Sequence, residues 1–138
     1  MNVSRTFIDT NVLVYAFTAD EPAKQKTALT ILDNCFPVVS TQVIKEFAHV
    51  LLNKAKNIHE SLHFAIQDII TVADVLPETT AHILNALTVC KRYGYSFYDS
   101  LIIAAALEAN CQTLLSEDMQ DNQVIDGRLI IRNPFAMH

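Results

Sequence analysis

Short apolar segments rich in β-branched residues alternate along this chain with longer segments whose apolar residues recur at helical spacing. This alternation is typical of βαβ units, in which parallel strands are joined by right-handed helical crossovers. We therefore expect an α/β fold: a three-layer α/β/α domain with a short central parallel sheet and helices on both faces. The sequence predicts strands at residues 4–9, 37–39, 72–76, 112–115 and 128–131, and helices at 22–35, 41–56, 61–71, 80–93 and 97–109.

Size and composition predict one folded domain spanning residues 1–138. The chain is 51% hydrophobic and 18% charged, and it has only two glycines, which excludes disordered and low-complexity classes. Cys35, Cys90 and Cys111 are too far apart for a metal-binding motif, and we expect each to be a buried apolar residue in a reducing compartment. The N-terminus lacks a signal-peptide pattern, and the longest apolar run, Leu101 to Leu107, is far shorter than a membrane span. We expect a soluble, cytoplasmic protein without a membrane partner.

The charge balance at first argues against a nucleic-acid partner. The chain has ten Lys and Arg residues and fifteen Asp and Glu residues, which gives a formal net charge of −5. Proteins that bind phosphate backbones usually show a basic surplus instead. The argument changes if several of the acids share one functional site.

Four acids fall where strands end or helices begin. Asp9 closes the first predicted strand, and Asp118 lies shortly after the strand that ends at Leu115. Glu46 lies in the first turns of the helix that follows strand 37–39, and Asp99 lies at the start of the apolar helix. Since ligands of parallel α/β sheets bind beyond the carboxyl ends of the strands, we expect these acids to converge on one rim.

Each acid also has a purely structural interpretation. Asp9 could stabilise a turn together with Asn11, and Glu46 could be a solvated residue on a polar helix face. Ser96 and Asp99 have the spacing of a capping box, in which the acid bonds back to the capping residue just before the helix. Glu117 is consistent with an ordinary loop residue.

Convergence would make the four acids repel one another by about 1–4 kcal/mol per pair at contact distances. A divalent cation would remove this cost, and ligands that are all oxygen favour Mg²⁺ or Mn²⁺ over zinc. Such an ion activates water and neutralises a phosphate oxygen during hydrolysis. The acids therefore suggest metal-assisted phosphodiester chemistry.

Four segments, in this order, resemble PIN-domain nucleases: residues 3–17, 40–47, 96–106 and 114–120. Residues 124–127 and 133–135 are similar to the tail of VapC-type toxins of toxin–antitoxin pairs. The resemblance implies a PIN-like fold and a Mg²⁺- or Mn²⁺-dependent endoribonuclease that cleaves RNA. It also implies a cognate antitoxin partner and a homodimer. An apolar groove for the antitoxin would use Phe17, Phe36, Phe47 and Leu51 or Leu52, although the same side chains would make an adequate core.

The resemblance also implies roles for individual residues. The catalytic acids would be Asp9, Glu46, Asp99 and Asp118, and the metal ligands among them Asp9, Asp99 and Asp118. Asn11, as a partner of Asp9, and Ser116 would support the site. Lys45 and Arg92 are candidate RNA contacts because they lie near Glu46 and Asp99 in sequence, and His49 could approach the rim. All other cations are consistent with solvated surface.

Two alternatives remain open. A catalytically silent PIN-like module could bind RNA or protein, although the complete set of acids favours an enzyme. A phosphoacceptor receiver domain would need paired acids early in the chain and a lysine after a late strand. Asp9 has no acidic neighbour, and the late strand is followed by Ser116, Glu117 and Asp118.

Overall fold

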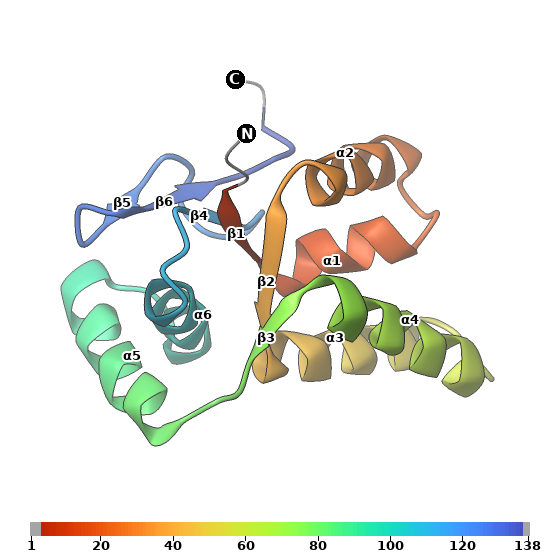
Figure 1. Cartoon of the computed structure of the whole chain (residues 1–138), viewed down its shortest axis with the longest axis horizontal. Coiled ribbons are helices and arrows are strands. Elements are labelled where there is room, and N and C mark those ends of the chain that lie inside the picture. Colours follow the sequence, from red (N-terminus) through yellow and green to blue (C-terminus); the bar gives the residue numbers. More distant parts are fainter. Residues whose placement is uncertain (1–3, 137–138) are drawn as a thin grey trace.

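The computed structural model describes residues 4–136, and in this range six helices surround a six-stranded sheet (Figure 1). The strands are β1 (Arg5–Ile8), β2 (Phe36–Ser40), β3 (Asp74–Leu76), β4 (Thr113–Leu115), β5 (Val124–Ile125) and β6 (Leu129–Arg132). The helices are α1 (Thr10–Phe17), α2 (Pro22–Asp33), α3 (Thr41–Lys54), α4 (His59–Val72), α5 (Thr80–Tyr93) and α6 (Phe97–Glu108).

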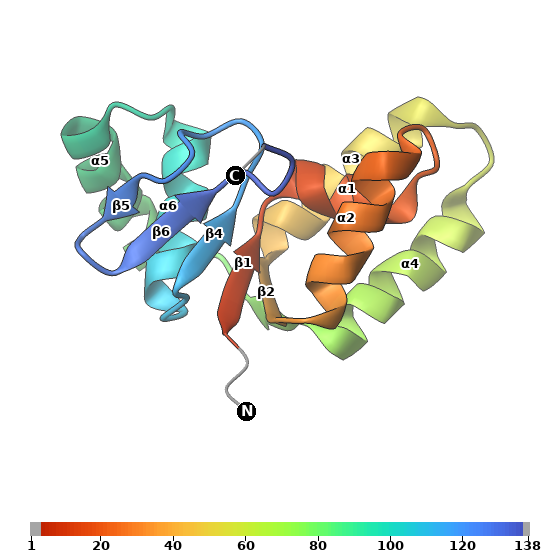
Figure 2. The ribbon, with the colours of Figure 1, turned by 90° about the horizontal axis from the view of Figure 1, so that it is seen from above.

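The sheet has the strand order β3-β2-β1-β4-β6-β5, and every neighbouring pair is parallel except β5 with β6. Helices α1 to α4 lie together on one side of the molecule, and α5 and α6 on the other, in both views (Figures 1 and 2). The predicted three-layer α/β/α arrangement with a mostly parallel sheet is confirmed. Strands β1 and β4 are adjacent at its centre, so their carboxyl ends lie side by side.

The sequence prediction missed helix α1. Val12, Val14 and Tyr15 favour strands in isolation, yet this segment forms two turns of helix directly after β1. Asp9 caps the helix, and burial on nearly all sides outweighs the β preference of the valines. The short antiparallel β5 was also missed, although the predicted turn at Asp126 and Gly127 is present, with φ values of 52° and 67°.

Several predicted boundaries were wrong by one or two residues, and the helices expected over 22–35 and 41–56 end at Asp33 and Lys54. The expected strand over residues 72–76 begins at Asp74, because α4 continues through Val72. Helix α4 also begins at His59, two residues before the predicted start at Ser61.

Helix α6 packs against α5 and is buried without interruption from Ser100 to Leu107, as its apolar composition predicts. Cys111 is buried as expected, whereas Cys35, which packs against the edge of the core, and Cys90 are only half-buried. None of the helices within residues 4–136 combines the length and the apolar character needed to cross a membrane.

Candidate active site

Asp9 stands where β1 ends and α1 begins. Its backbone N–H donates to the carbonyl of Leu115 at the end of β4 (3.0 Å). Its carboxylate accepts hydrogen bonds from the backbone N–H of Thr10 (2.7 Å) and from the hydroxyl of Ser116 (2.9 Å). The side chain is almost fully buried. Two adjacent strands therefore fix one carboxylate at the carboxyl edge of the sheet.

Glu46 reaches the same edge from α3. The hydroxyl of Thr10 donates to its Oε2, and the amide of Gln42 donates to its Oε1, both at 2.8 Å. The Gln42 amide also donates to the carbonyl of Tyr98 (3.3 Å), the residue before Asp99. Each oxygen of the Glu46 carboxylate is thus held by a different element.

Asp99 lies in the first turn of α6, where its backbone N–H donates to the Ser96 hydroxyl (3.1 Å), as the capping pattern predicts. Asp118 follows β4, and its carboxylate accepts a hydrogen bond from the amide of Asn11 (2.5 Å). We expected Asn11 to support Asp9, but its side chain binds Asp118, because Asn11 lies in the first turn of α1 and faces the loop after β4. Ser116 supports both acids, since its hydroxyl also accepts the N–H of Asp118 (3.3 Å).

The four acids surround one open cavity of about 360 Å³. The structure thereby brings together side chains from the end of β1, from α3, from α6 and from the loop after β4. The lining is completed by Thr10, Asn11, Lys45, His49 and Val50.

The environment of this cavity disfavours the charged forms of Asp9 and Asp99. Burial raises the pKa of Asp9 to about 6, and the negative charges of Asp99 and Glu46 add to the increase. The hydrogen bonds that Asp9 accepts from Ser116 and Thr10 act in the opposite direction and lower the pKa. Burial also raises the pKa of Asp99, and the charges of Asp118 and Glu46 act in the same direction. In residues 4–136 none of the four acids forms a salt bridge with Lys or Arg.

The donor set of this cavity fits a hard divalent cation. It is made of carboxylate oxygens that lack cationic partners and repel one another, which is the chemistry that Mg²⁺ and Mn²⁺ satisfy. Within the described residues, the side chains as they stand form no group of three or more His, Cys, Asp or Glu that could hold an ion.

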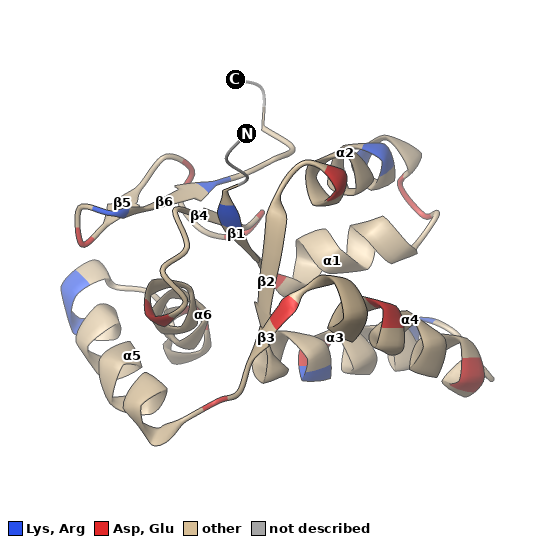
Figure 3. Cartoon of the chain, in the orientation of Figure 1, with Lys and Arg blue, Asp and Glu red and all other residues tan. Residues whose placement is uncertain are grey.

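The two predicted RNA contacts lie in different places. Lys45 lines the cavity of the acids, and its ammonium is 2.7 Å from a carboxylate oxygen of Glu78. Arg92 lines a separate cavity of about 250 Å³ beside the β5–β6 hairpin, where it pairs with Asp126 (3.3 Å). Figure 3 shows Lys and Arg spread over several elements rather than collected on one face.

Sequence reasoning missed Thr10 and Gln42 as partners of Glu46. Gln42 lies one helical turn before Glu46, so the i, i+4 spacing could have indicated it. Thr10 is 36 positions away in sequence, and only the packing of α1 on α3 reveals its contact.

A family model matches most of the sequence. Residues 6–123 match the model described as PIN domain. The chain therefore belongs to the PIN domain family.

Solved structures share the fold at low sequence identity. A toxin–antitoxin complex from Klebsiella pneumoniae matches with a TM-score of 0.72 and 16% identity, covering 96% of this chain and 99% of the other. VapBC2 from Rickettsia felis, bound to a promoter DNA fragment, matches with a TM-score of 0.66 and 19% identity, covering 94% of this chain and 98% of the other. The sarcin–ricin loop cleaving toxin VapC20 from Mycobacterium tuberculosis matches with a TM-score of 0.66 and 22% identity, covering 79% of this chain and 86% of the other. No curated protein matches the sequence significantly.

Proposed function

We propose that this protein is a metal-dependent endoribonuclease that hydrolyses RNA phosphodiester bonds and acts as the toxin of a VapC-type toxin–antitoxin pair. The observation that carries the proposal is the convergence of Asp9, Glu46, Asp99 and Asp118 on one open cavity. Membership of the PIN domain family supports it, as does the shared fold with solved toxins.

In this proposal Asp9, Asp99 and Asp118 hold Mg²⁺ or Mn²⁺, directly or through water. When bound, the ion supplies an activated water and neutralises charge on the phosphate. Glu46 would help to hold the ion or would orient the attacking water, and hydrogen bonds at both of its oxygens fix the direction of its carboxylate. Ser116 and Asn11 support the site by holding Asp9 and Asp118.

Lys45 is the better of the two predicted RNA contacts. It lines the cavity, and its side chain is 71% exposed, so it can exchange its ion pair with Glu78 for a phosphate. Arg92 lies in the other cavity and is paired with Asp126, so a contact there would have to be made by a more distant part of the RNA.

The proposed partner is an antitoxin protein. We further propose that this protein is cytoplasmic and forms a homodimer. Two apolar grooves, of about 510 and 370 Å³, meet at Phe17 at the end of α1. Leu51 lines the larger groove, and the next residue, Leu52, is exposed. Phe36 is also exposed, and its neighbours in sequence, Cys35 and Pro37, line the smaller groove. Phe47, which we expected in this groove, is wholly buried in the core and packs edge-on against Phe17.

The test is an incubation of purified, antitoxin-free protein with a pool of structured RNAs in Mg²⁺, in Mn²⁺ and in EDTA. Asp9→Asn and Asp118→Asn keep side-chain size and remove charge. We expect cleavage in either metal and none in EDTA or with either variant. Metal-dependent cleavage that survives both substitutions would refute the site, and RNA binding without cleavage would favour the silent binding module.

A further inference from the structure

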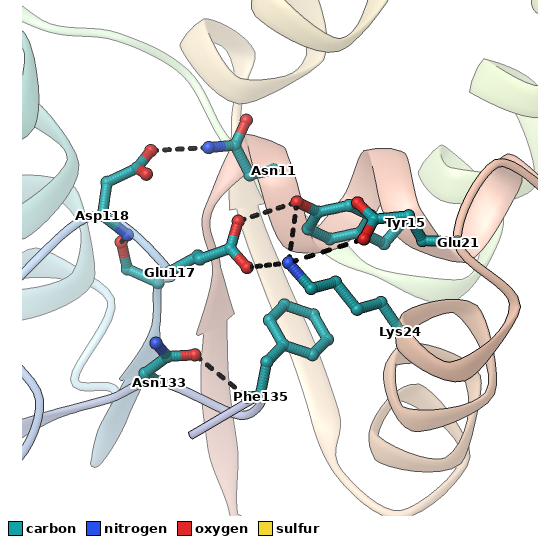
Figure 4. A network of polar contacts seen from close by, with 9 residues as sticks. Asn11, Tyr15, Glu21, Lys24, Glu117, Asp118, Asn133 and Phe135 are labelled. Carbon is teal, nitrogen blue, oxygen red and sulfur yellow. Dashed lines mark hydrogen bonds and ion pairs between the residues drawn. The ribbon is translucent and has the colours of Figure 1, made fainter. Parts of the chain in front are cut away.

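A second polar cluster lies beside the cavity of the acids, formed by Tyr15, Lys24 and Glu117 (Figure 4). The Tyr15 hydroxyl donates to Oε1 of Glu117 (2.7 Å), and the Lys24 ammonium donates to Oε2 (2.5 Å) and to the Tyr15 oxygen (3.3 Å). These three residues belong to α1, to α2 and to the loop after β4. None of them lines the cavity.

The contacts of α1 with this loop follow a simple pattern. Asn11 and Tyr15 are one helical turn apart, so their side chains lie on the same face of α1. Asn11 binds the carboxylate of Asp118, and Tyr15 binds the carboxylate of the preceding residue, Glu117. Two consecutive loop residues are thus attached to two consecutive turns of one helix, which fixes both the position and the rotation of the loop.

Lys24 closes the cluster from α2. Its ammonium lies 4.8 Å from the ring centre of Tyr15 and 5.4 Å from that of Phe135, and the two rings meet edge to face. The side chains of Lys24 and Glu117 are only 31% and 23% exposed. This pair is more enclosed than an ordinary surface ion pair, which stabilises a protein little because water screens it.

From these contacts we infer that Lys24, Glu117 and Tyr15 are positioning residues that hold the loop after β4 so that Asp118 faces the cavity. The inference rests on the proposed function, because its consequence is the affinity of the acids for a divalent ion. Removing a group that does not contact the metal but orients one of its ligands typically lowers metal affinity about 10- to 100-fold. Lys24 also compensates the charge of Glu117, which would otherwise be an unpaired acid beside the site.

The test measures Mn²⁺ binding to the RNA-free protein by isothermal titration calorimetry. We expect Lys24→Met and Glu117→Gln each to raise the dissociation constant by about tenfold. Tyr15→Phe removes only one hydroxyl and should give a smaller loss in the same direction. Lys24→Arg keeps the charge and should restore most of the affinity.

The matched control is Lys54→Met, which removes a lysine from an ion pair with Asp20 (2.8 Å) that involves neither the loop after β4 nor the lining of the cavity, and which should leave the affinity unchanged. Unchanged Mn²⁺ affinity in Lys24→Met and Glu117→Gln, even with a lower Tm, would show a merely structural cluster and overturn the inference. Tighter binding in Lys24→Met alone would also overturn it, since charge rather than position would then dominate. A wild-type protein that binds no Mn²⁺ would instead refute the proposed function, and the inference with it.

Discussion

Asp9 is the residue at which the stability of the fold and the chemistry of the site are in conflict. Its carboxylate caps α1 from a buried position, and its pKa rises from 3.8 to about 6. The metal-free folded protein therefore binds more protons than the unfolded chain between these two pH values, and its stability falls as the pH rises through that window. At neutral pH a shift of this size corresponds to about 3 kcal/mol of destabilisation.

Asp9→Asn should therefore stabilise the metal-free protein at pH 7, by about 1–3 kcal/mol after the partial loss of its hydrogen bonds. Urea denaturation in EDTA at a series of pH values measures this. The difference in the free energy of unfolding between wild type and variant isolates the contribution of Asp9 from that of the other carboxyl groups. This difference should grow as the pH rises from about 4 to about 6. A difference that stays constant over that range would contradict the raised pKa.

Ser116 is the second residue on which the geometry of the site depends. It is fully buried, its hydroxyl donates to Asp9, and it accepts the N–H groups of Asp118 and Met119. Ser116→Ala should lower the free energy of unfolding by about 1–3 kcal/mol, because two donors lose their acceptor. Ser100→Ala is a suitable control, since Ser100 is equally buried but accepts from the weak thiol donor of Cys90. Equal losses in the two variants would contradict this account.

At the scale of elements, the sequence predicted the parallel sheet and the places of the four acids better than it predicted α1. Strand ends and helix starts follow local periodicity, so Asp9 and Asp118 could be assigned to one edge before the structure was known. Helix α1 could not, because its valines favour a strand unless tertiary burial is taken into account. The contact of Lys24 with Glu117 spans 93 positions, and no local pattern indicates it.

The turn between α5 and α6 sets the start of the helix that carries Asp99. Gly94 ends α5 in the left-handed region, with φ of 78°, and an added Cβ would meet no atom within 4 Å. Gly94→Ala should therefore cost about 1 kcal/mol through backbone strain alone, and Gly94→Asn should cost less because asparagine tolerates this conformation. Thermal unfolding of both variants measures the difference. An alanine variant as stable as wild type would show that this turn does not require glycine.

For the whole molecule, the net charge of −5 no longer argues against RNA. Of the fifteen acids, four line one cavity, which leaves eleven against ten Lys and Arg residues. A bound divalent ion would make the cavity itself attractive to phosphate. The acidity of the chain is therefore compatible with an RNA substrate.

The apolar grooves give a second prediction for the whole molecule. Leu29 and Val72 line the groove between α2 and α4, and their side chains are exposed. The antitoxin-free protein should increase the fluorescence of a hydrophobic dye, and Leu29→Glu combined with Val72→Glu should reduce that increase. Ile83→Glu with Leu84→Glu on the exposed face of α5 is the matched control and should reduce it less. Equal reductions would mean that the groove is not the main apolar surface.

The initial rate of RNA cleavage as a function of free Mn²⁺ tests the central claim most directly. We expect the rate of the wild-type protein to rise with Mn²⁺, to reach a plateau and to fall to background when EDTA is added. Asp9→Asn should require at least about tenfold more Mn²⁺ or show no cleavage, whereas Asp20→Asn, a charge removal away from the cavity, should behave as wild type. Cleavage that is independent of Mn²⁺, or equal in Asp9→Asn and wild type, would contradict a metal-dependent nuclease built on these four acids.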